Sequence, residues 1–287
     1  MNKLSVCLIV KNEEAMLPAC LASISEADEI IVCDTGSTDD TIKIATEANV
    51  KLIHYKWDDD FAAARNYVKD HAAHDWVLSI DADEILKPGS VAAIKESISK
   101  TDKTVLFVAM TDSKDGSTFN SVRLFNKKHN WVGLIHEALD CCATDSSGGE
   151  IIYGYSPTHH VDPKLDLRIL LKAVEQYPES ARYRYYLGRE YYYIKSFLEA
   201  EHHFKLCLKY NQWTPERADT FLYLAKINWL ESRGEMARKY CMSALNLNAH
   251  FAEAARFMAS ISWEKNAAPW LAMAEAANNS EVLFIRK

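Results

Sequence analysis

The chain has 287 residues, 48% hydrophobic and 25% charged, which excludes wholesale disorder and is typical of one or two globular domains. The net charge of −7 is unevenly divided: residues 1–162 hold 15 Lys and Arg against 26 Asp and Glu, whereas residues 163–287 hold 18 against 14. This asymmetry indicates two halves with different tasks, and the acidic balance argues against a general nucleic-acid-binding protein.

The first half of the sequence alternates strand-like and helix-like segments. Apolar, β-branched segments that predict strands lie at residues 4–10, 29–33, 50–55, 75–80, 104–110, 121–125, 131–139 and 151–155. Helical patterns separate the first four, so we expect βαβ units and a largely parallel sheet covered on both faces. After a further helix that ends near residue 99, the remaining strands predict a mixed sheet whose last strands are antiparallel.

From residue 165 onward the segments read as helices. Leu187-Gly188 and Ala200 recur as Leu224-Ala225 and Ala237, 37 residues later, close to the 34-residue period of tetratricopeptide repeats. Small residues at these positions let paired helices approach closely, and each hairpin buries its apolar face against its neighbour. We expect two domains, residues 1–162 and residues 163–287, the second tetratricopeptide-like.

The sequence lacks the usual signals of a membrane protein or a secreted protein. No apolar run approaches the roughly 20 residues of a membrane-spanning helix, and charged residues interrupt the first apolar stretch too early for a secretory signal. The seven cysteines are odd in number and form no Cys-x-x-Cys pair, which argues against a disulfide framework and a zinc finger. We therefore expect a cytoplasmic protein with no transmembrane segment.

The segment Asp81-Ala82-Asp83-Glu84 directly follows an apolar strand. It places carboxylates at the carboxyl end of that strand, where ligands bind in open α/β sheets. Carboxylates are hard oxygen donors suited to Mg²⁺ or Mn²⁺ on a diphosphate. The alternative is a solvated acidic turn.

A second acidic segment, Asp34-Thr35-Gly36-Ser37-Thr38-Asp39, also follows a strand and opens a helix. A carboxylate there can accept hydrogen bonds from a base N–H or a ribose hydroxyl. The alternative is a strand-to-helix turn in which Gly36 supplies backbone freedom and an Asp or Thr caps the helix.

Asn12-Glu13-Glu14, the Asp34 segment, Ala64-Arg65-Asn66 and the Asp81 segment occur in this order, each near a strand end or the following helix. This closely resembles family 2 glycosyltransferases with a GT-A fold. The stretches DFAAARN and WVLSIDADE further resemble the branch with lipopolysaccharide-core transferases and peptide glycosyltransferases with helical-repeat tails. The resemblance implies an α/β GT-A domain with a mixed sheet, followed by an all-α repeat domain. It also implies a nucleotide-diphosphate sugar donor and inversion at the anomeric carbon.

Carried over residue by residue, the resemblance assigns donor-binding roles in the first half of the chain. It makes Asp34 the uracil contact and places Glu13 beside the ribose or the base. Asp81 and Asp83 hold the ribose and the metal-bound diphosphate, with Asp83 as a metal ligand. Arg65 either lies close to the nucleotide or structures the site through a carboxylate.

Beyond residue 84 the sequence departs from the family pattern, because no clear Glu-Asp pair supplies the general base. Gly133-Leu134-Ile135-His136-Glu137 resembles the His-Glu element of the repeat-tailed branch. An inverting transfer needs a carboxylate to take the acceptor proton, which makes Glu137 the candidate base. His136 is a candidate metal ligand or phosphate contact. A purely structural His–Glu pair is the alternative.

Three further features have both a functional and a structural interpretation. His159 of the His159-His160 pair could reach the metal or diphosphate, or could belong to a polar interdomain turn. Arg123 could neutralise the leaving phosphate, or could pair with an acidic strand neighbour. The stretch around Arg182 and Arg184, interleaved with tyrosines, could line an acceptor groove or pack between helices.

The sequence thus predicts a metal-dependent inverting glycosyltransferase that uses Mn²⁺ or Mg²⁺ and a nucleotide-diphosphate sugar, with UDP as the expected nucleotide. The acceptor classes considered are a protein or peptide, a glycolipid, and DNA that carries modified bases. A helical-repeat scaffold with an inactive first domain is the non-enzymatic alternative. A nucleotidyltransferase is a third class, although the first strand is followed by Lys11-Asn12-Glu13-Glu14 rather than by a glycine-rich phosphate loop.

Overall fold

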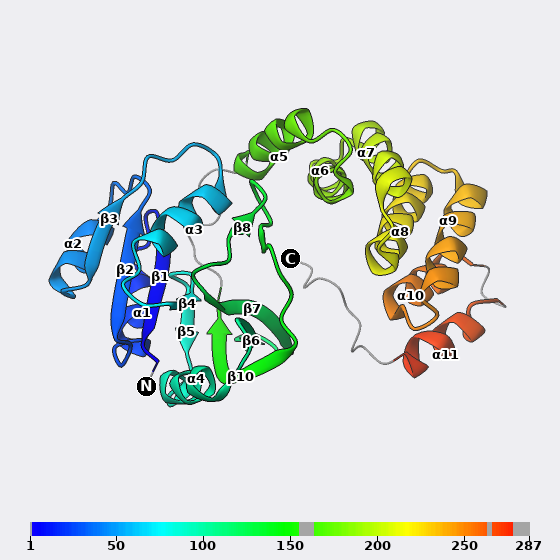
Figure 1. Cartoon of the computed structure of the whole chain (residues 1–287). Coiled ribbons are helices and arrows are strands. Elements are labelled where there is room, and N and C mark those ends of the chain that lie inside the picture. The colour runs from blue at the N-terminus through cyan, green and yellow to red at the C-terminus, as the bar shows by residue number, and fades with distance from the viewer. Residues whose placement is uncertain (1, 155–163, 263–265, 278–287) are drawn as a thin grey trace. The chain divides into compact units, whose positions relative to one another are not determined.

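The computed structural model describes residues 2–154, 164–262 and 266–277. The chain divides into two compact units, Met1–Pro163 and Lys164–Lys287 (Figure 1). Among the described residues, no helix is long and apolar enough to cross a lipid bilayer.

The first unit is built on an eight-stranded mixed sheet in the order β3-β2-β1-β4-β7-β6-β10-β5. Strands β1 to β4 are parallel to one another, and β7 runs antiparallel to both β4 and β6. The strands of this sheet are β1 Leu4–Val10, β2 Glu29–Asp34, β3 Lys51–His54, β4 Trp76–Ser79, β5 Glu84–Leu86, β6 Val105–Asp112, β7 Thr118–Asn126 and β10 Asp145–Tyr153. The helices are α1 Leu17–Ser23, α2 Thr41–Glu47, α3 Phe61–Asp70 and α4 Ser90–Lys100.

The expected α/β fold with a mixed sheet is confirmed, but the strand predictions were wrong in three details. The segment 131–139 is not one strand, because β8 Trp131–Val132 and β9 Ala138–Leu139 form a separate antiparallel hairpin. Strand β10 pairs parallel with β6, and only its other edge pairs antiparallel, with β5. Strand β5 was missed, because it has only three residues, begins at the last residue of the acidic segment, and is too short for a period to be recognised.

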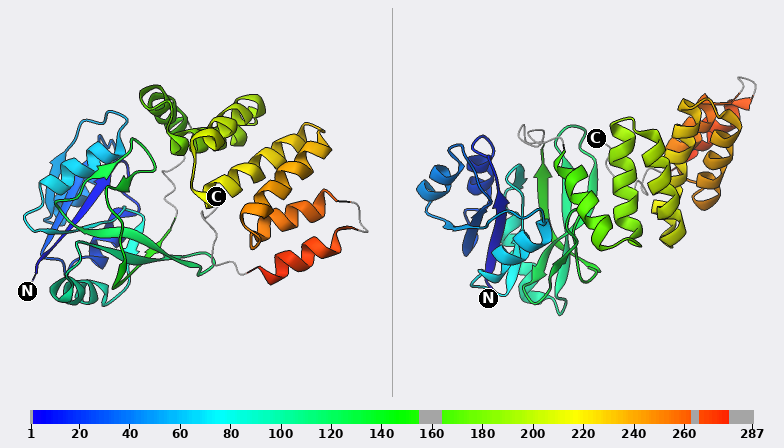
Figure 2. Two further views of the ribbon diagram at one scale, coloured as in Figure 1. Left: turned by 45° about the vertical axis from the view of Figure 1, so that its right-hand side comes forward. Right: turned by 90° about the horizontal axis from the view of Figure 1, so that it is seen from above.

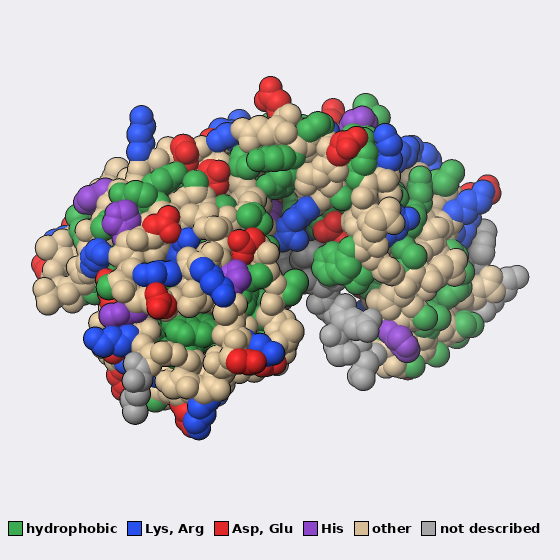
Figure 3. Space-filling model, viewed as in Figure 1, with side chains coloured by type: hydrophobic (Ala, Val, Ile, Leu, Met, Phe, Trp, Pro, Cys, Tyr) green, Lys and Arg blue, Asp and Glu red, His purple; other side chains and the backbone are tan. Residues whose placement is uncertain are grey.

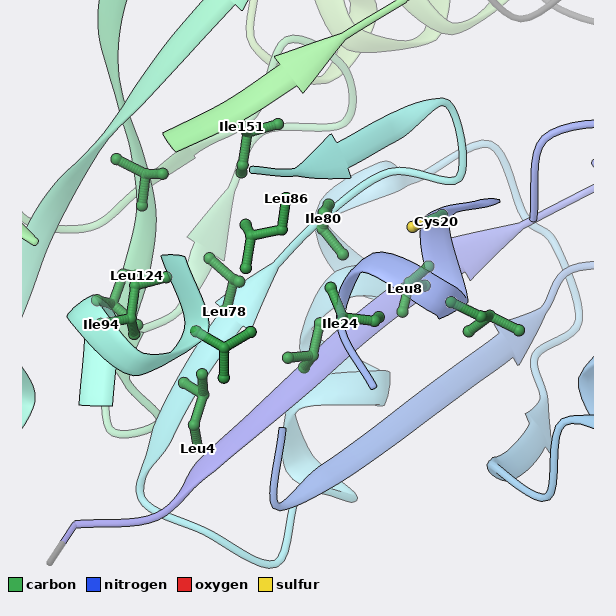
Figure 4. Packing of buried hydrophobic residues seen from close by; sticks show 14 of the residues in the cluster. Leu4, Leu8, Cys20, Ile24, Leu78, Ile80, Leu86, Ile94, Leu124 and Ile151 are labelled. Atoms are coloured by element: carbon green, nitrogen blue, oxygen red, sulfur yellow. The ribbon is translucent and has the colours of Figure 1, made fainter. Parts of the chain in front are cut away.

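Alternating side chains of β1 build the two cores of the first unit. Leu4 and Leu8 point to the face of the sheet that α1 and α4 cover (Figure 4). Their side chains are fully buried, as are those of Ile24 and Ile94 in the same cluster. Cys7 points to the opposite face and packs in the cluster that contains residues of α3. Because a strand turns successive side chains to opposite faces, the continuous apolar run of β1 reflects a sheet covered on both sides.

The second unit is helical throughout its described residues and pairs successive helices (Figure 2). These helices are α5 Leu165–Gln176, α6 Ala181–Tyr193, α7 Phe197–Tyr210, α8 Thr214–Leu230, α9 Gly234–Leu247, α10 Ala252–Ser260 and α11 Ala268–Ala276. The small residues expected at repeat positions are buried at the helix contacts, among them Ala200 and Ala237. Gly188 lies so close to Phe204 that a Cβ atom added to it would be 2.8 Å from two ring carbons.

This close approach gives a test of the helix packing. We expect Gly188→Ala to lower the free energy of unfolding by about 1–2 kcal/mol, because overpacking costs about 1–3 kcal/mol and the gain in helix propensity offsets at most about 1 kcal/mol. Urea unfolding followed by circular dichroism measures the change. In the background of Phe204→Leu, which removes the ring, Gly188→Ala should cost less. An equal loss of unfolding free energy in both backgrounds would show that the Phe204 ring is not the cause of the destabilisation.

Candidate functional site

The loops that follow β1 and β2 are tied together by hydrogen bonds. Asn12 adopts a left-handed backbone conformation with φ of 56°, and its Oδ1 accepts a hydrogen bond from the Thr38 N–H at 2.7 Å. The Asn12 N–H donates to the Ser37 Oγ at 2.9 Å. The next residue, Glu13, is buried, and its N–H donates to the Thr41 Oγ1 at 2.7 Å. Glu13 is therefore fixed at the carboxyl ends of β1 and β2.

Asp34 ends β2 and caps the turn that follows it. Its carboxylate accepts hydrogen bonds from the N–H groups of Gly36 and Ser37, at 3.0 and 3.1 Å. Gly36 has a φ of 110°, a conformation that side-chain-bearing residues rarely adopt. His54 Nδ1 lies 3.6 Å from the same carboxylate. The turn role expected as one alternative for Asp34 is present, and the uracil contact stays a prediction.

A buried guanidinium joins three elements at the centre of the site. Helix α3 begins at Phe61, where the Asp60 carboxylate caps the helix by accepting from the Ala63 N–H. One turn later, Arg65 points between the strand ends.

Arg65 donates hydrogen bonds through each of its side-chain nitrogens. Nε donates to Glu137 Oε1 at 2.5 Å, Nη1 to the Ser79 hydroxyl at 3.0 Å, and Nη2 to Asp81 Oδ1 at 2.9 Å. The guanidinium also lies over the Trp131 ring, 5.4 Å from its centroid. Ser79, which the sequence analysis did not single out, is therefore part of the network; its place at the end of β4 was the available signal.

A second guanidinium, from Arg123 on β7, completes the network. It contacts the other oxygen of Asp81 at 3.3 Å and donates to Glu84 Oε1 at 2.8 Å. Burial opposes ionisation of Asp81, but Arg65 and Arg123 together hold its pKa well below the usual range. Burial raises the pKa of Glu84 to about 7; Arg123 opposes this shift and Asp81 reinforces it. Arg123 thus pairs with acidic neighbours, as its structural alternative expected.

Of the remaining candidate ligands, the structure describes Asp83 and His136. Asp83 is buried in the turn between β4 and β5, where its carbonyl accepts from the Gly154 N–H at 3.1 Å. His136 has a φ of 52° in the connection between β8 and β9. His159 lies outside the described residues, so the metal set of Asp83, His136 and His159 stays a prediction.

Hydrogen bonds fix the β8–β9 hairpin to α3. One of the residues involved, Asn66, belongs to the Ala64-Arg65-Asn66 motif, but the sequence predicted no role for it. Asn66 and Trp131 exchange two hydrogen bonds of 2.9 Å, from Asn66 Nδ2 to the carbonyl and from the Trp131 N–H to Asn66 Oδ1. The Phe61 N–H donates to the Leu134 carbonyl at 2.8 Å. These bonds place Glu137, whose side chain is 11% exposed, beside Arg65.

In the second unit, the Arg/Tyr stretch mainly packs between helices. Arg184 donates to the Pro178 carbonyl at 3.0 Å and lies 3.2 Å from His203 Nδ1. The Tyr185 hydroxyl donates to the Asp219 carboxylate, and the Tyr185 ring is fully buried. Arg182 stacks over the Tyr186 ring at 5.3 Å. These contacts match the packing alternative rather than an open groove.

Charged side chains on the viewed face of the first unit are mixed, and no single sign dominates there (Figure 3). At the strand ends, Asp34, Asp83 and Glu84 are buried, and the Asp81 side chain is 29% exposed. Two guanidiniums offset part of this negative charge. Carboxylate oxygens are the ligands that hard divalent cations prefer, and they also accept hydrogen bonds from the hydroxyls of a ligand.

The buried pairs make a prediction about stability. We expect Arg65→Met to lower the free energy of unfolding by about 3–5 kcal/mol, because it leaves buried carboxylates without their partner. Lys43→Met is the matched control: it breaks the Lys43–Asp40 pair, whose side chains are 64% and 66% exposed, and should cost less than about 1 kcal/mol. Urea denaturation measures both. Similar small losses for the two variants would show that the Arg65 network contributes little.

Comparison with known proteins assigns the first unit to a family. Residues 5–147 match the family described as "Glycosyl transferase family 2". A TPR repeat-containing protein of Synechococcus elongatus is 42% identical over 145 residues, which cover 49% of this chain and 36% of that protein. The SPbeta prophage-derived glycosyltransferase SunS of Bacillus subtilis is 24% identical over 229 residues, which cover 73% of this chain and 54% of SunS. Each match thus spans less than two thirds of the relative's own length.

Two solved structures are also similar to this chain. Glucosyl-3-phosphoglycerate synthase from Mycobacterium tuberculosis, in complex with Mn²⁺, UDP and phosphoglyceric acid, is 25% identical; the match covers 40% of this chain and 44% of the synthase, with a TM-score of 0.35. TarS 1–349 of S. aureus is 13% identical; the match covers 95% of this chain and 90% of TarS, with a TM-score of 0.43. The family assignment depends on the sequence match, and the matched range includes Asp34, Arg65 and Asp81. The chain therefore contains a glycosyltransferase domain of family 2, residues 5–147, followed by a second unit that is helical throughout its described residues.

Proposed function

We propose that this chain transfers a sugar from a nucleotide-diphosphate donor, a UDP-sugar, to a hydroxyl of an acceptor, with inversion at the anomeric carbon. The observation that carries the proposal is the convergence of acidic side chains at the carboxyl ends of β1, β2 and β4, within a domain of this family. In open α/β sheets this edge is where ligands bind. The buried contacts there give it the rigidity that positioning a donor requires.

In the proposed donor site, the two loops after β1 and β2 hold the nucleoside. Asp34 and Glu13 are both buried at this edge, and hydrogen bonds between the loops fix their backbones. A carboxylate in such a position accepts from a base N–H or a ribose hydroxyl. Asp81, held in its ionised form by two guanidiniums, serves as an acceptor for ribose hydroxyls.

The donor set fits a hard divalent ion beside the diphosphate. Asp83 supplies carboxylate oxygens in a turn that the Gly154 N–H holds through the Asp83 carbonyl. Bound there, Mn²⁺ or Mg²⁺ would neutralise charge that develops on the leaving diphosphate. We assign Asp83 as the principal protein ligand, with His136 and His159 as the further candidates. Arg123 stays paired with Asp81 and Glu84 in this scheme and offsets phosphate charge from a distance.

Glu137 is the proposed general base. The Arg65 Nε–H donates to its Oε1, which orients the carboxylate, and the β8–β9 hairpin carries it to the same edge of the sheet as the donor residues. The base takes the acceptor proton while the acceptor oxygen attacks the anomeric carbon. The competing role for Glu137 is to neutralise Arg65 without touching the acceptor.

The helical unit is the proposed acceptor-binding or partner-binding part of the chain. Its repeat pattern and its small surplus of positive charge support this division of labour. We propose a protein or peptide, or a glycolipid, as the acceptor. Tyr185 is fully buried and Arg184 donates to the Pro178 carbonyl of its own unit, so the search for acceptor contacts includes other side chains of this unit.

The assignment of Asp83 as a metal ligand predicts that donor binding weakens when its carboxylate is removed. We expect Asp83→Ala to weaken Mn²⁺-dependent binding of UDP by at least about tenfold, or ~1.4 kcal/mol. Isothermal titration calorimetry with and without Mn²⁺ measures the effect. Asp75→Ala is the matched control, because Asp75 precedes the same strand, β4, and has a side chain that is 77% exposed. Wild-type affinity in Asp83→Ala would remove Asp83 from the metal site.

The base assignment predicts a loss of rate without a loss of donor affinity. We expect Glu137→Gln to lower kcat by about 10²–10⁴-fold, because an amide cannot take the proton. The Kd for UDP with Mn²⁺ should stay within about threefold of the wild-type value. Steady-state transfer to an acceptor identified by screening, together with calorimetry, gives both quantities. Transfer at the wild-type rate would assign Glu137 a structural role only.

A further inference from the structure

A cluster of three possible metal ligands lies at the base of the β8–β9 hairpin, outside the network described above. His129 precedes β8, and Asp140 and Cys141 follow β9. One ligand atom from each of the three residues lies within 4.8 Å of the other two. Within the described residues, no other group of three or more His, Cys, Asp or Glu side chains meets this distance criterion.

The spacing of these atoms is close to that of a tetrahedral site. His129 Nδ1 and Asp140 Oδ1 are 3.1 Å apart. Zinc bonds of about 2.0–2.3 Å to N, O and S place neighbouring ligand atoms about 3.3–3.8 Å apart in a tetrahedron. Cys141 and Asp140 are not fully buried, which leaves their side chains room to rotate toward one ion.

Hydrogen bonds to neighbouring residues already orient two of the proposed ligands, His129 and Asp140. The Nε2 of His129 lies 2.8 Å from the Thr104 Oγ1, so Nε2–H can donate there while Nδ1 faces the cluster. The second oxygen of Asp140 accepts from the Asn130 N–H at 3.2 Å. Outer hydrogen bonds of this kind fix the tautomer of a ligating histidine and the direction of a ligating carboxylate.

From this arrangement we propose that His129, Asp140 and Cys141 bind one divalent ion of the zinc class, with water as a fourth ligand. On binding, the Cys141 thiol releases its proton to solvent and binds as the thiolate. A site with nitrogen and sulfur ligands selects zinc over Mg²⁺ and Mn²⁺, which prefer oxygen. The proposal does not depend on the proposed donor site.

The cluster lies at the opposite end of β4 from the donor residues. The Lys127 N–H donates to the Asp75 carbonyl at 2.7 Å, which places the start of the His129 loop at the amino end of this strand. Asp81 and Asp83 follow the carboxyl end. The two metal sites are therefore separate, and each can be removed by substitution without altering the ligands of the other.

An ion here would join the two ends of the segment that carries Glu137. The Asp140 N–H already donates to the Asn130 carbonyl at 2.9 Å, next to the proposed ligands. Binding would lower the freedom of residues 129–141 when the hairpin opens, since a cross-link across a loop reduces the entropy of its open states. The site would therefore stabilise the hairpin that contacts Arg65.

The test uses cobalt as a spectroscopic probe in the full-length, tag-free, reduced protein. A tetrahedral Co²⁺ site with a thiolate ligand should give a sulfur-to-metal charge-transfer band and visible d–d bands, which zinc then abolishes by displacement. Cys141→Ser should remove the charge-transfer band and lower zinc affinity at least about tenfold. Cys142→Ser is the matched control, because Cys142 is the adjacent, exposed thiol outside the cluster.

Two further variants serve different purposes: one separates this site from the proposed donor site, and the other tests the outer hydrogen bond of His129. Asp83→Ala should leave the cobalt band intact, so failure of the donor-site assignment would not affect the result. Thr104→Val keeps the three ligands but removes the outer hydrogen bond, and should weaken zinc binding by about 10–100-fold. Absence of the band in the wild-type protein would overturn the proposal. Loss of the band in Cys142→Ser, with retention in Cys141→Ser, would also overturn it.

Discussion

The buried charge of Arg65 is the constraint on which the glycosyltransferase domain depends. A guanidinium at this depth needs several acceptors, and it finds them on two segments outside its own helix: Ser79 and Asp81 at the end of β4, and Glu137 between β8 and β9. Because the strand ends, α3 and the β8–β9 hairpin must all be in place to satisfy it, the geometry of the site is coupled to the fold of the whole unit. Asp81 is held as an anion by the same contacts.

One face of α3 fastens the segment that carries Glu137. Arg65 binds Glu137, Asn66 exchanges two bonds with Trp131, and the buried Lys69 donates to Asn130 Oδ1 at 2.8 Å. Lys69 follows Asn66 by three residues and Arg65 by four, and these spacings bring side chains to one side of a helix. A short hairpin with only four strand residues thereby gains a fixed position, and the proposed zinc site would close the same segment from its other end.

The helical region reaches its stability by a different route. Its contacts are set by small residues that admit bulky partners, such as Gly188 against Phe204, and by buried polar groups that pair across helices, such as Tyr185 with Asp219. Such packing is local to neighbouring helices, so the unit can vary its exposed side chains without loss of its core. That freedom is what an acceptor-binding or partner-binding region needs.

The sequence by itself determined the fold class, the alternation of β1 to β4 with helices and the helical second half, and it singled out Asp34, Arg65 and Asp81 as candidate site residues. Those features depend on local periodicity and on motifs contiguous in the chain, which one sequence displays directly. Only the tertiary structure decided that β10 runs parallel to β6 and that residues 131–139 fold back as a hairpin. It also decided the partners of each buried charge and the meeting of His129 with Asp140 and Cys141. Strand direction and side-chain pairing depend on contacts between segments far apart in the chain, and no local pattern records them.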